Sequence, residues 1–126
     1  MIGVFDSGLG GLSVLAALVD ALPRADFSYY ADTAHVPYGN KSDELIQGRV
    51  LAIGEHLAER GCKLLVVACN TATATAVQAL RAAHPGIPVV GVEPGIKPAA
   101  QETQSGRIAV LATEATASSQ IGRAHV

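Results

Sequence analysis

A single cysteine stands where an apolar run gives way to small polar residues, in the stretch "KLLVVACNTATA" from Lys63 to Ala74. In a parallel sheet, binding and catalytic sites form where strands end and loops lead into helices. A thiol at such a point faces a helix N-terminus, whose dipole stabilises a thiolate, and the polar side chains of Asn70 and Thr71 stand beside it. From these residues alone, Cys69 is either a buried structural thiol or a reactive one.

A second candidate loop is "DSGLGG", Asp6 to Gly11, directly after the first apolar run. Its glycines let backbone N–H groups turn towards a ligand, and the following helix N-terminus favours an anion such as a carboxylate. The loop is not the dinucleotide fingerprint, because the third glycine of G-x-G-x-x-G falls on Ser13. A tight strand-to-helix turn explains the glycines equally well, but it does not explain Asp6 and Ser7.

The third loop is "HVPYGNKS", His35 to Ser42, which by composition is an ordinary turn with a tyrosine inside it. It lacks the glycine before Lys41 that a phosphate-binding loop of the Walker type needs. The other chemistry-bearing residues give weaker signals. Cys62 is predicted to be a packed small hydrophobe at a strand's start, and its spacing from Cys69 fits no zinc pair, so we expect no metal. Solvated positions are expected for His56, His84 and His125.

Alternating short apolar runs and helical patterns must position these loops. Strands are predicted at Ile2–Phe5, Phe27–Tyr30, Leu64–Ala68, Val89–Val92 and Ile108–Leu111. Helices are predicted over Leu12–Leu22, over Asp43–Arg60 with Ser42 as N-cap and Gly61 as its stop, and over Thr71–Ala83. On the long helix the predicted apolar face includes Leu45. The alternation indicates an α/β fold with a mainly parallel sheet flanked by helices.

The composition excludes several classes of protein. The chain has 126 residues, 49% of them hydrophobic, which suffices for a core. A formal net charge of -2 gives no basic surface for nucleic acid, and the apolar runs fall far short of the roughly 20 residues that span a bilayer. Neither a nucleic-acid partner nor a membrane is therefore expected, and a cytoplasmic protein is.

The local composition changes at "GVEPGIKPAA", where prolines and glycines cluster between Gly91 and Pro98. We interpret this as the passage into a second structural unit. The predicted organisation is a first domain over residues 1–93, the beginning of a second α/β domain over 94–120, and a non-native tail over 121–126. The tail "IGRAHV" resembles the in-frame translation of a common sequencing adapter.

Four segments in one order, "GVFDSGLGG", "DTAHVPYGNKS", "VVACNTATA" and "GVEPGIKPA", resemble the Asp/Glu racemase family, and within it the glutamate racemases. The resemblance implies cofactor-independent interconversion of L- and D-glutamate, supplying D-glutamate for peptidoglycan. It implies a racemase-type α/β fold, glutamate as the small-molecule partner, no cofactor, and a homodimer as one state of the full-length protein.

The same resemblance implies roles for nine residues. Cys69 is similar in position to one of two catalytic thiols, and Asp6 to the acidic residue that helps set its protonation. Racemisation without a cofactor needs one base to remove the α-proton and an acid on the opposite face to return one. The implied substrate contacts, besides Asp6, are Ser7, Tyr38, Gly39, Asn70, Thr71, Thr113 and Thr116.

The chain departs from the family pattern in one respect. The family's second cysteine lies in a "GCTH"-type segment, and nothing like it occurs here. Cys62 is predicted at the opposite end of the strand that carries Cys69 and cannot replace it. The chain is therefore expected to be an N-terminal fragment, inactive alone. An aspartate racemase or related two-cysteine racemase, and a non-enzymatic carboxylate-binding module with an inert thiol, remain as alternatives.

Overall fold

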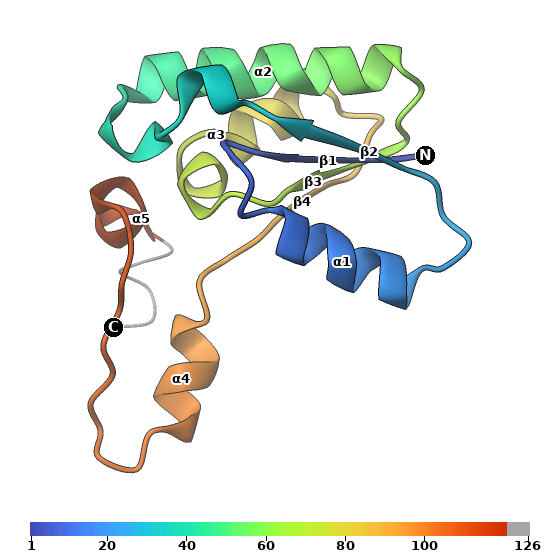
Figure 1. Ribbon diagram of the computed structural model, residues 1–126. Coiled ribbons are helices and arrows are strands. Elements are labelled where there is room, and N and C mark those ends of the chain that lie inside the picture. Colours follow the sequence, from blue (N-terminus) through green and yellow to red (C-terminus); the bar gives the residue numbers. More distant parts are fainter. Residues whose placement is uncertain (121–126) are drawn as a thin grey trace.

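Four parallel strands in the order β2-β1-β3-β4 form the centre of the protein. The computed structural model describes residues 1–120 (Figure 1). The strands are β1 (Ile2–Asp6), β2 (Phe27–Ala31), β3 (Leu64–Val67) and β4 (Val89–Gly91), and the helices are α1 (Leu12–Ala21), α2 (Asp43–Glu59), α3 (Asn70–Ala83), α4 (Ile96–Glu102) and α5 (Glu114–Ser118). Two short 3-10 helices, Thr33–His35 and Tyr38–Asn40, connect β2 to α2. The predicted α/β fold with a parallel sheet is confirmed.

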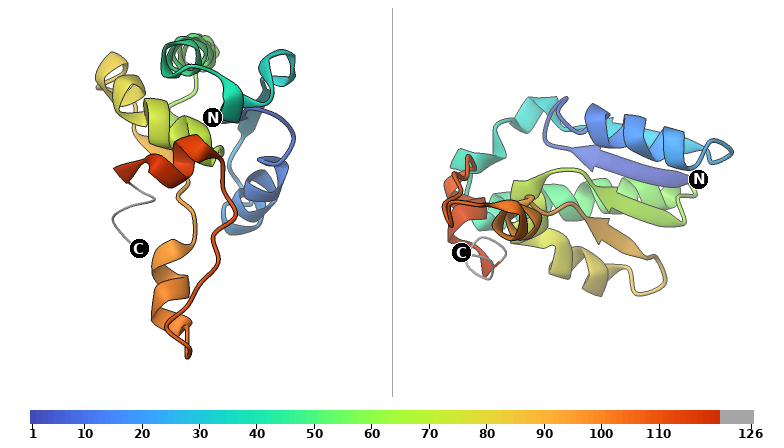
Figure 2. Two further views of the ribbon diagram at one scale, coloured as in Figure 1. Left: turned by 90° about the vertical axis from the view of Figure 1, so that its left-hand side faces the viewer. Right: turned by 90° about the horizontal axis from the view of Figure 1, so that it is seen from below.

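Helices cover the two faces of the sheet unequally: α2 and α3 lie on one face and α1 on the other (Figures 1 and 2). The period of two along a strand sends successive side chains to opposite faces. Thus Phe5 and Val67 join the larger core, which includes buried side chains of α2 and α3, whereas Val4 and Val66 join a smaller core beneath α1. Both faces of β1 and β3 are buried, as a parallel sheet requires.

The ends of α2 follow the local signals in the sequence. Ser42 caps the helix, its side chain accepting a hydrogen bond from the Leu45 backbone N–H at 3.2 Å. Gly61 follows it with a φ of +89°, a left-handed conformation that glycine adopts without steric cost. The predicted apolar face is wrong at one position: Leu45 is exposed, while Ile46, Val50, Ile53 and Leu57 are buried. None of the helices over residues 1–120 is both long and apolar enough to span a bilayer.

The predicted strand at Ile108–Leu111 is wrong. This segment has no regular secondary structure between α4 and α5, and Ile108, Val110 and Leu111 are all exposed. The chain leaves the sheet after β4, and α4 and the following segment extend away from it (Figure 1). A strand is held by hydrogen bonds to a neighbour, and within residues 1–120 no strand lies beside this segment. The domain boundary at residues 93–94 stays a prediction, and the predicted tail lies outside the described residues.

A buried carboxylate organises the connection from β2 to α2, and the sequence analysis did not anticipate it. Asp32, only 3% exposed, accepts hydrogen bonds from Arg49 Nε at 3.0 Å and Nη2 at 2.9 Å, from the Tyr38 hydroxyl at 2.6 Å, and pairs with His35 Nδ1 at 3.1 Å. Burial opposes ionisation of this carboxyl, but the hydrogen bonds from Arg49, Tyr38 and His35 outweigh it and lower the pKa of Asp32 to about 2.

The hydrogen bonds of Asp32 predict that the free energy of unfolding decreases at acidic pH. Because the pKa of folded Asp32 lies below its ordinary value of 3.8, its stabilising effect is complete above that value and is lost as the pH falls towards about 2. Asp32→Asn leaves the Arg49 charge unpaired and is expected to lower the free energy of unfolding at neutral pH by roughly 3 kcal/mol. It should also flatten the dependence of that free energy on pH in the acidic window.

Urea unfolding of the wild type and the variant, followed at a series of pH values, measures both effects. Asp20→Asn is the matched control, because Asp20 is an exposed carboxylate on α1. An Asp32→Asn protein as stable as the Asp20→Asn protein at neutral pH would contradict the assigned role of the pair.

Candidate active site

Cys69 stands at the junction of β3 and α3. It is the N-cap of α3, with extended backbone angles, and its Sγ accepts a hydrogen bond from the Ala72 backbone N–H at 3.4 Å. Its thiol in turn donates to Ser7 Oγ, 3.7 Å away on the loop after β1. The residue is 7% exposed. The thiol is therefore held in one orientation by the helix start and by a hydroxyl from a neighbouring loop.

The loop "DSGLGG" folds around the carboxylate of Asp6. Asp6 Oδ2 accepts hydrogen bonds from the backbone N–H groups of Gly8 at 3.2 Å and Gly11 at 3.0 Å. These are glycine N–H groups that were expected to turn towards a ligand, so that part of the prediction is wrong. The carboxylate belongs to the loop itself, and because Gly11 is the N-cap of α1, the negative charge of Asp6 lies at the start of that helix.

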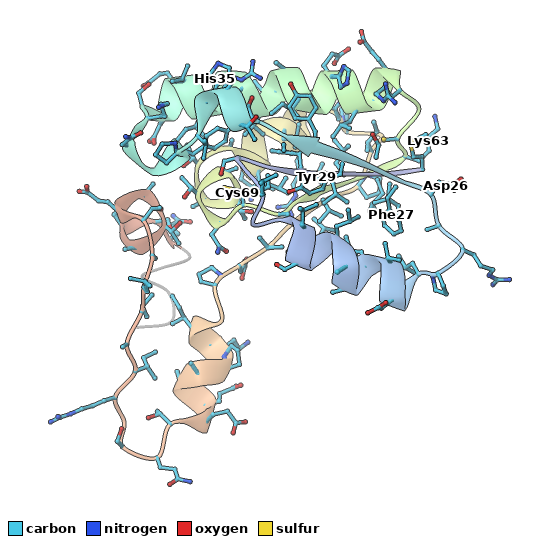
Figure 3. All side chains as sticks on the ribbon, in the orientation of Figure 1. Asp26, Phe27, Tyr29, His35, Lys63 and Cys69 are labelled. Carbon is cyan, nitrogen blue, oxygen red and sulfur yellow. The ribbon has the colours of Figure 1, made fainter. Side chains whose placement is uncertain are left out.

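Tyr29 on β2 holds this loop through a hydrogen bond. Its hydroxyl donates to the Gly8 carbonyl at 3.1 Å, and Figure 3 shows Tyr29 on the side of the sheet that carries α1. Burial, together with the negative charge of Asp6, raises the pKa of Tyr29, so the hydroxyl remains a donor. Gly11 has no room for a side chain, because a Cβ there would lie 2.7 Å from Asp6 Cβ and 2.9 Å from the Tyr29 hydroxyl.

A cavity of about 570 Å³ opens at the carboxyl edge of the sheet, within the range of small-molecule sites. Six predicted site residues line it: Asp6, Cys69, Asn70, Thr71, Thr113 and Thr116. Gly10, Ser13, Val14, Ala68, Val92, Glu93, Pro94, Leu111 and Ala112 complete the lining. The loops after β1, β3 and β4 thus meet with the start of α5 around one space.

Threonine hydroxyls join α5 to this edge of the sheet. Thr113 caps α5, and its Oγ1 lies 2.8 Å from Thr71 Oγ1. The same oxygen donates to Thr116 Oγ1 at 3.2 Å, so the proton in the Thr71–Thr113 bond comes from Thr71. Gly39 packs against this point, since a Cβ on it would lie 2.7 Å from Thr113 Cγ2. Thr113 therefore contacts both α3 and the connection from β2 to α2.

Three predicted site residues do not line the cavity. Ser7 contacts the lining residue Cys69, and Gly39 contacts the lining residue Thr113. Tyr38 is 2% exposed and its hydroxyl donates to Asp32, and burial together with this hydrogen bond raises its pKa. The side chain of Tyr38 is therefore committed to the protein interior, so a ligand contact from this residue has to come from its main chain.

Among the lining residues that the sequence analysis did not predict, one is charged. Glu93 follows β4 and places a second carboxylate at the cavity beside Asp6. The signal was present, because Glu93 comes directly after a predicted strand at the same edge as Asp6 and Cys69. Among the described residues that line the cavity none is basic, so the lining offers carboxylates for a cationic group and hydroxyl, amide and backbone groups for an anionic one.

The remaining chemistry-bearing side chains lie elsewhere. Cys62 is 1% exposed, and its Sγ would lie 3.1 Å from a Cβ on Gly3, near the start of β1. This buried position agrees with its predicted role as a packed small hydrophobe. His56 contacts Tyr30 edge-on, whereas His84 is mostly buried with Nε2 3.6 Å from Glu55, so the expected solvation of His84 is wrong. His125 lies outside the described residues. No cluster of three or more metal-binding side chains occurs over residues 1–120.

Comparison with known proteins identifies relatives of this chain. Residues 2–126 match the family model Asp/Glu/Hydantoin racemase. A glutamate racemase of Pseudomonas aeruginosa is 55% identical over 115 residues, which are 91% of this chain and 43% of that protein. The structure of Escherichia coli glutamate racemase in complex with L-glutamate and an activator superposes with a TM-score of 0.89 at 44% identity, covering 98% of this chain and 46% of that one.

A third relative is the glutamate racemase of Francisella tularensis in complex with D-glutamate, with a TM-score of 0.83 and 34% identity over 98% of this chain and 46% of that one. The chain thus spans less than half the length of each of these three relatives. The family model matches residues 2–126, and the two solved racemase structures superpose on 98% of the chain. The chain belongs to the Asp/Glu/hydantoin racemase family.

Proposed function

We propose that this chain is the N-terminal part of a glutamate racemase that interconverts L- and D-glutamate without pyridoxal phosphate. The observation that carries the proposal is the Cys69 thiol, fixed at the start of α3 and lining a cavity with Asp6, Asn70 and Thr71. The relatives at about 55% identity are glutamate racemases, and the solved structures of two others hold L-glutamate or D-glutamate.

In the proposed mechanism Cys69 acts as one of two bases. As thiolate it takes the α-proton, the electron pair of the broken C–H bond remains on the substrate as a carbanion stabilised by the carboxyl group, and a thiol on the opposite face delivers a proton to the same carbon. In the reverse direction the two groups exchange roles. Of the two cysteines in the chain only Cys69 lines the cavity, so the second thiol is assigned to the part of the relatives that this chain does not span.

Asp6 is suited to influence the protonation of Cys69 because only one of its oxygens is occupied by the loop. Oδ2 accepts from Gly8 and Gly11, while the carboxylate lines the same cavity as the thiol. Asn70 and Thr71, in the first turn of α3, are the proposed contacts of a substrate carboxylate, since a helix N-terminus favours negative charge. Thr113 and Thr116 complete the contacts from the other side of the cavity.

The proposed product determines the proposed physiological role. D-glutamate is a component of peptidoglycan, so the intact enzyme would act in cell-wall synthesis and cell shape, in the cytoplasm where the precursors are made. The intact enzyme is proposed to need no cofactor, because the two thiols perform both proton transfers.

One prediction of the proposed function concerns catalysis by the chain alone and by a completed enzyme. The 126-residue chain is expected to show no racemisation, because one face of the substrate lacks its acid or base. A chimera that joins residues 1–120 to the remainder of the Pseudomonas aeruginosa racemase, cut at the equivalent position, is expected to racemise glutamate, and Cys69→Ser in it to lower the rate at least about 100-fold. Chiral chromatography of L- and D-glutamate measures both.

The controls separate catalysis from folding and glutamate from aspartate. Cys62→Ala removes the other thiol and should leave the chimera active, and the unmodified Pseudomonas aeruginosa enzyme calibrates the assay. A chimera that unfolds cooperatively on heating yet racemises neither amino acid would refute the proposed function. Faster turnover of aspartate than of glutamate would instead assign the chain to an aspartate racemase.

Another prediction of the proposed function concerns the reactivity of the two thiols in the chain itself. Cys69 lines the cavity whereas Cys62 is packed between β1 and α2, so iodoacetamide should alkylate Cys69 at least about tenfold faster in the folded chain. Glutamate should slow the labelling of Cys69 and leave that of Cys62 unchanged. Mass spectrometry of the peptides after timed quenching gives both rates. Equal and slow labelling of the two thiols, unaffected by glutamate, would favour a module with an inert thiol.

A further inference from the structure

Arg49 does not line the cavity, but a continuous set of contacts leads from it to the cavity wall. We propose that Arg49 is a positioning residue of the site, acting through Asp32 to hold the Tyr38–Gly39 turn against Cys69 and Thr113. The inference rests on the proposed function only in naming glutamate as the ligand of the site. The contacts themselves are independent of that name.

The first step is the fork between Arg49 and Asp32. Arg49 lies on α2, and its Nε and Nη2 atoms donate to the two different oxygens of Asp32 at 3.0 and 2.9 Å. Asp32 follows β2, and its backbone N–H donates to the Asp6 carbonyl at 3.0 Å. Two parallel hydrogen bonds between planar groups fix both distance and orientation. The fork therefore fixes α2 relative to the end of β2, next to the loop that carries Asp6.

The second step connects Asp32 to Tyr38. The Tyr38 hydroxyl donates to Asp32 Oδ2 at 2.6 Å, the same oxygen that accepts from Arg49 Nε. With the bond from His35 at Oδ1, the carboxylate accepts four hydrogen bonds from three residues, which is about its full capacity. Tyr38 is 2% exposed and belongs to the same buried cluster as Cys69. Its ring position is therefore set at one end by the carboxylate and along its length by the core that surrounds the thiol.

The third step leads from Tyr38 to the cavity wall. Gly39 follows Tyr38 in the same short 3-10 helix and touches the side chain of Thr113, against which a Cβ would lie 2.7 Å away. Thr113 Oγ1 accepts from Thr71 at 2.8 Å, and both threonines line the cavity. A displacement of the Tyr38–Gly39 turn would thus move the contact that holds Thr113 beside Thr71.

Lysine at position 49 would keep the positive charge but lose the fork, since an ammonium group is a point charge without a fixed plane. We therefore expect Arg49→Lys to loosen the turn without unfolding the protein. In the full chain, well below its melting temperature, the ratio of Cys69 to Cys62 alkylation by iodoacetamide should rise about tenfold. The glutamate concentration that halves Cys69 labelling should rise by a similar factor.

The chain provides a matched control in Arg81 on α3. Its Nε and Nη2 atoms both donate to one oxygen, the Val89 carbonyl, at 3.2 and 3.0 Å, and within residues 1–120 no side-chain hydrogen bond joins Arg81 or Val89 to Tyr38 or Thr113. Arg81→Lys likewise removes a contact made by two guanidinium donors, here to a neutral oxygen away from the site, and should leave the labelling ratio and the protecting glutamate concentration unchanged. A purely structural role of Arg49 predicts the same result for Arg49→Lys as for Arg81→Lys, namely a lower melting temperature only.

A double-mutant cycle tests whether Arg49 acts through Tyr38. Tyr38→Phe removes the hydroxyl and keeps the ring, and the effect of Arg49→Lys on the labelling ratio should be clearly smaller in that background than in the wild type. An unchanged ratio in Arg49→Lys, or full additivity in the cycle, would overturn the inference. Failure of glutamate to protect Cys69 in the wild-type chain would count against the proposed function, while the labelling ratio without ligand still decides the role of Arg49.

Discussion

The parallel register of the sheet is the constraint on which the whole site depends. Hydrogen bonds continue one residue past β2, β3 and β4: Asp32 N–H donates to the Asp6 carbonyl at 3.0 Å, Ala68 N–H to the Phe5 carbonyl at 2.8 Å, and Val92 N–H to the Val67 carbonyl at 3.0 Å. Because parallel strands end at one edge, these bonds place the residues that follow β1, β2, β3 and β4 side by side. A shift of register by one residue would exchange the two faces of a strand and separate Asp6 from Cys69.

The carboxylate of Asp6 changes which helix terminus is available to a ligand. It accepts from the N–H groups of Gly8 and of Gly11, the N-cap of α1, so a negative charge of the protein already lies at the start of this helix. At the start of α3 the N-cap is a thiol instead, a weak acceptor that reaches only the Ala72 N–H, at 3.4 Å. Under the proposed function this difference directs the substrate carboxylate towards Asn70 and Thr71 and leaves Asp6 to act on the proton of Cys69.

Local signals in the sequence predicted most of the fold. The first four strands, the Ser42 cap and the turn at Gly61 follow from residues within a few positions of each feature. The strand expected at Ile108–Leu111 failed because its apolar pattern says nothing about whether a neighbouring strand is present. The Asp32–Arg49 pair was missed for a related reason: it joins residues 17 apart through side-chain geometry that no periodicity records. For Tyr38, composition placed a tyrosine near the site but could not tell that its hydroxyl faces Asp32.

The two sides of the cavity are supported very differently, which bears on the proposed function. Cys69 sits between β3 and α3, in a cluster that includes the most buried side chains of the protein. Thr113, on the other side, follows a segment without regular structure in which Leu111 is fully exposed, and it is held near α3 by a hydroxyl pair and by contact with Gly39. A general base needs a fixed position relative to the α-carbon, whereas a substrate must enter and leave. Under the proposed function the thiol holds the fixed position and the threonines of α5 make the adjustable contacts, so opening the cavity at α5 would break the Thr71–Thr113 hydrogen bond and leave the packing around Cys69 intact.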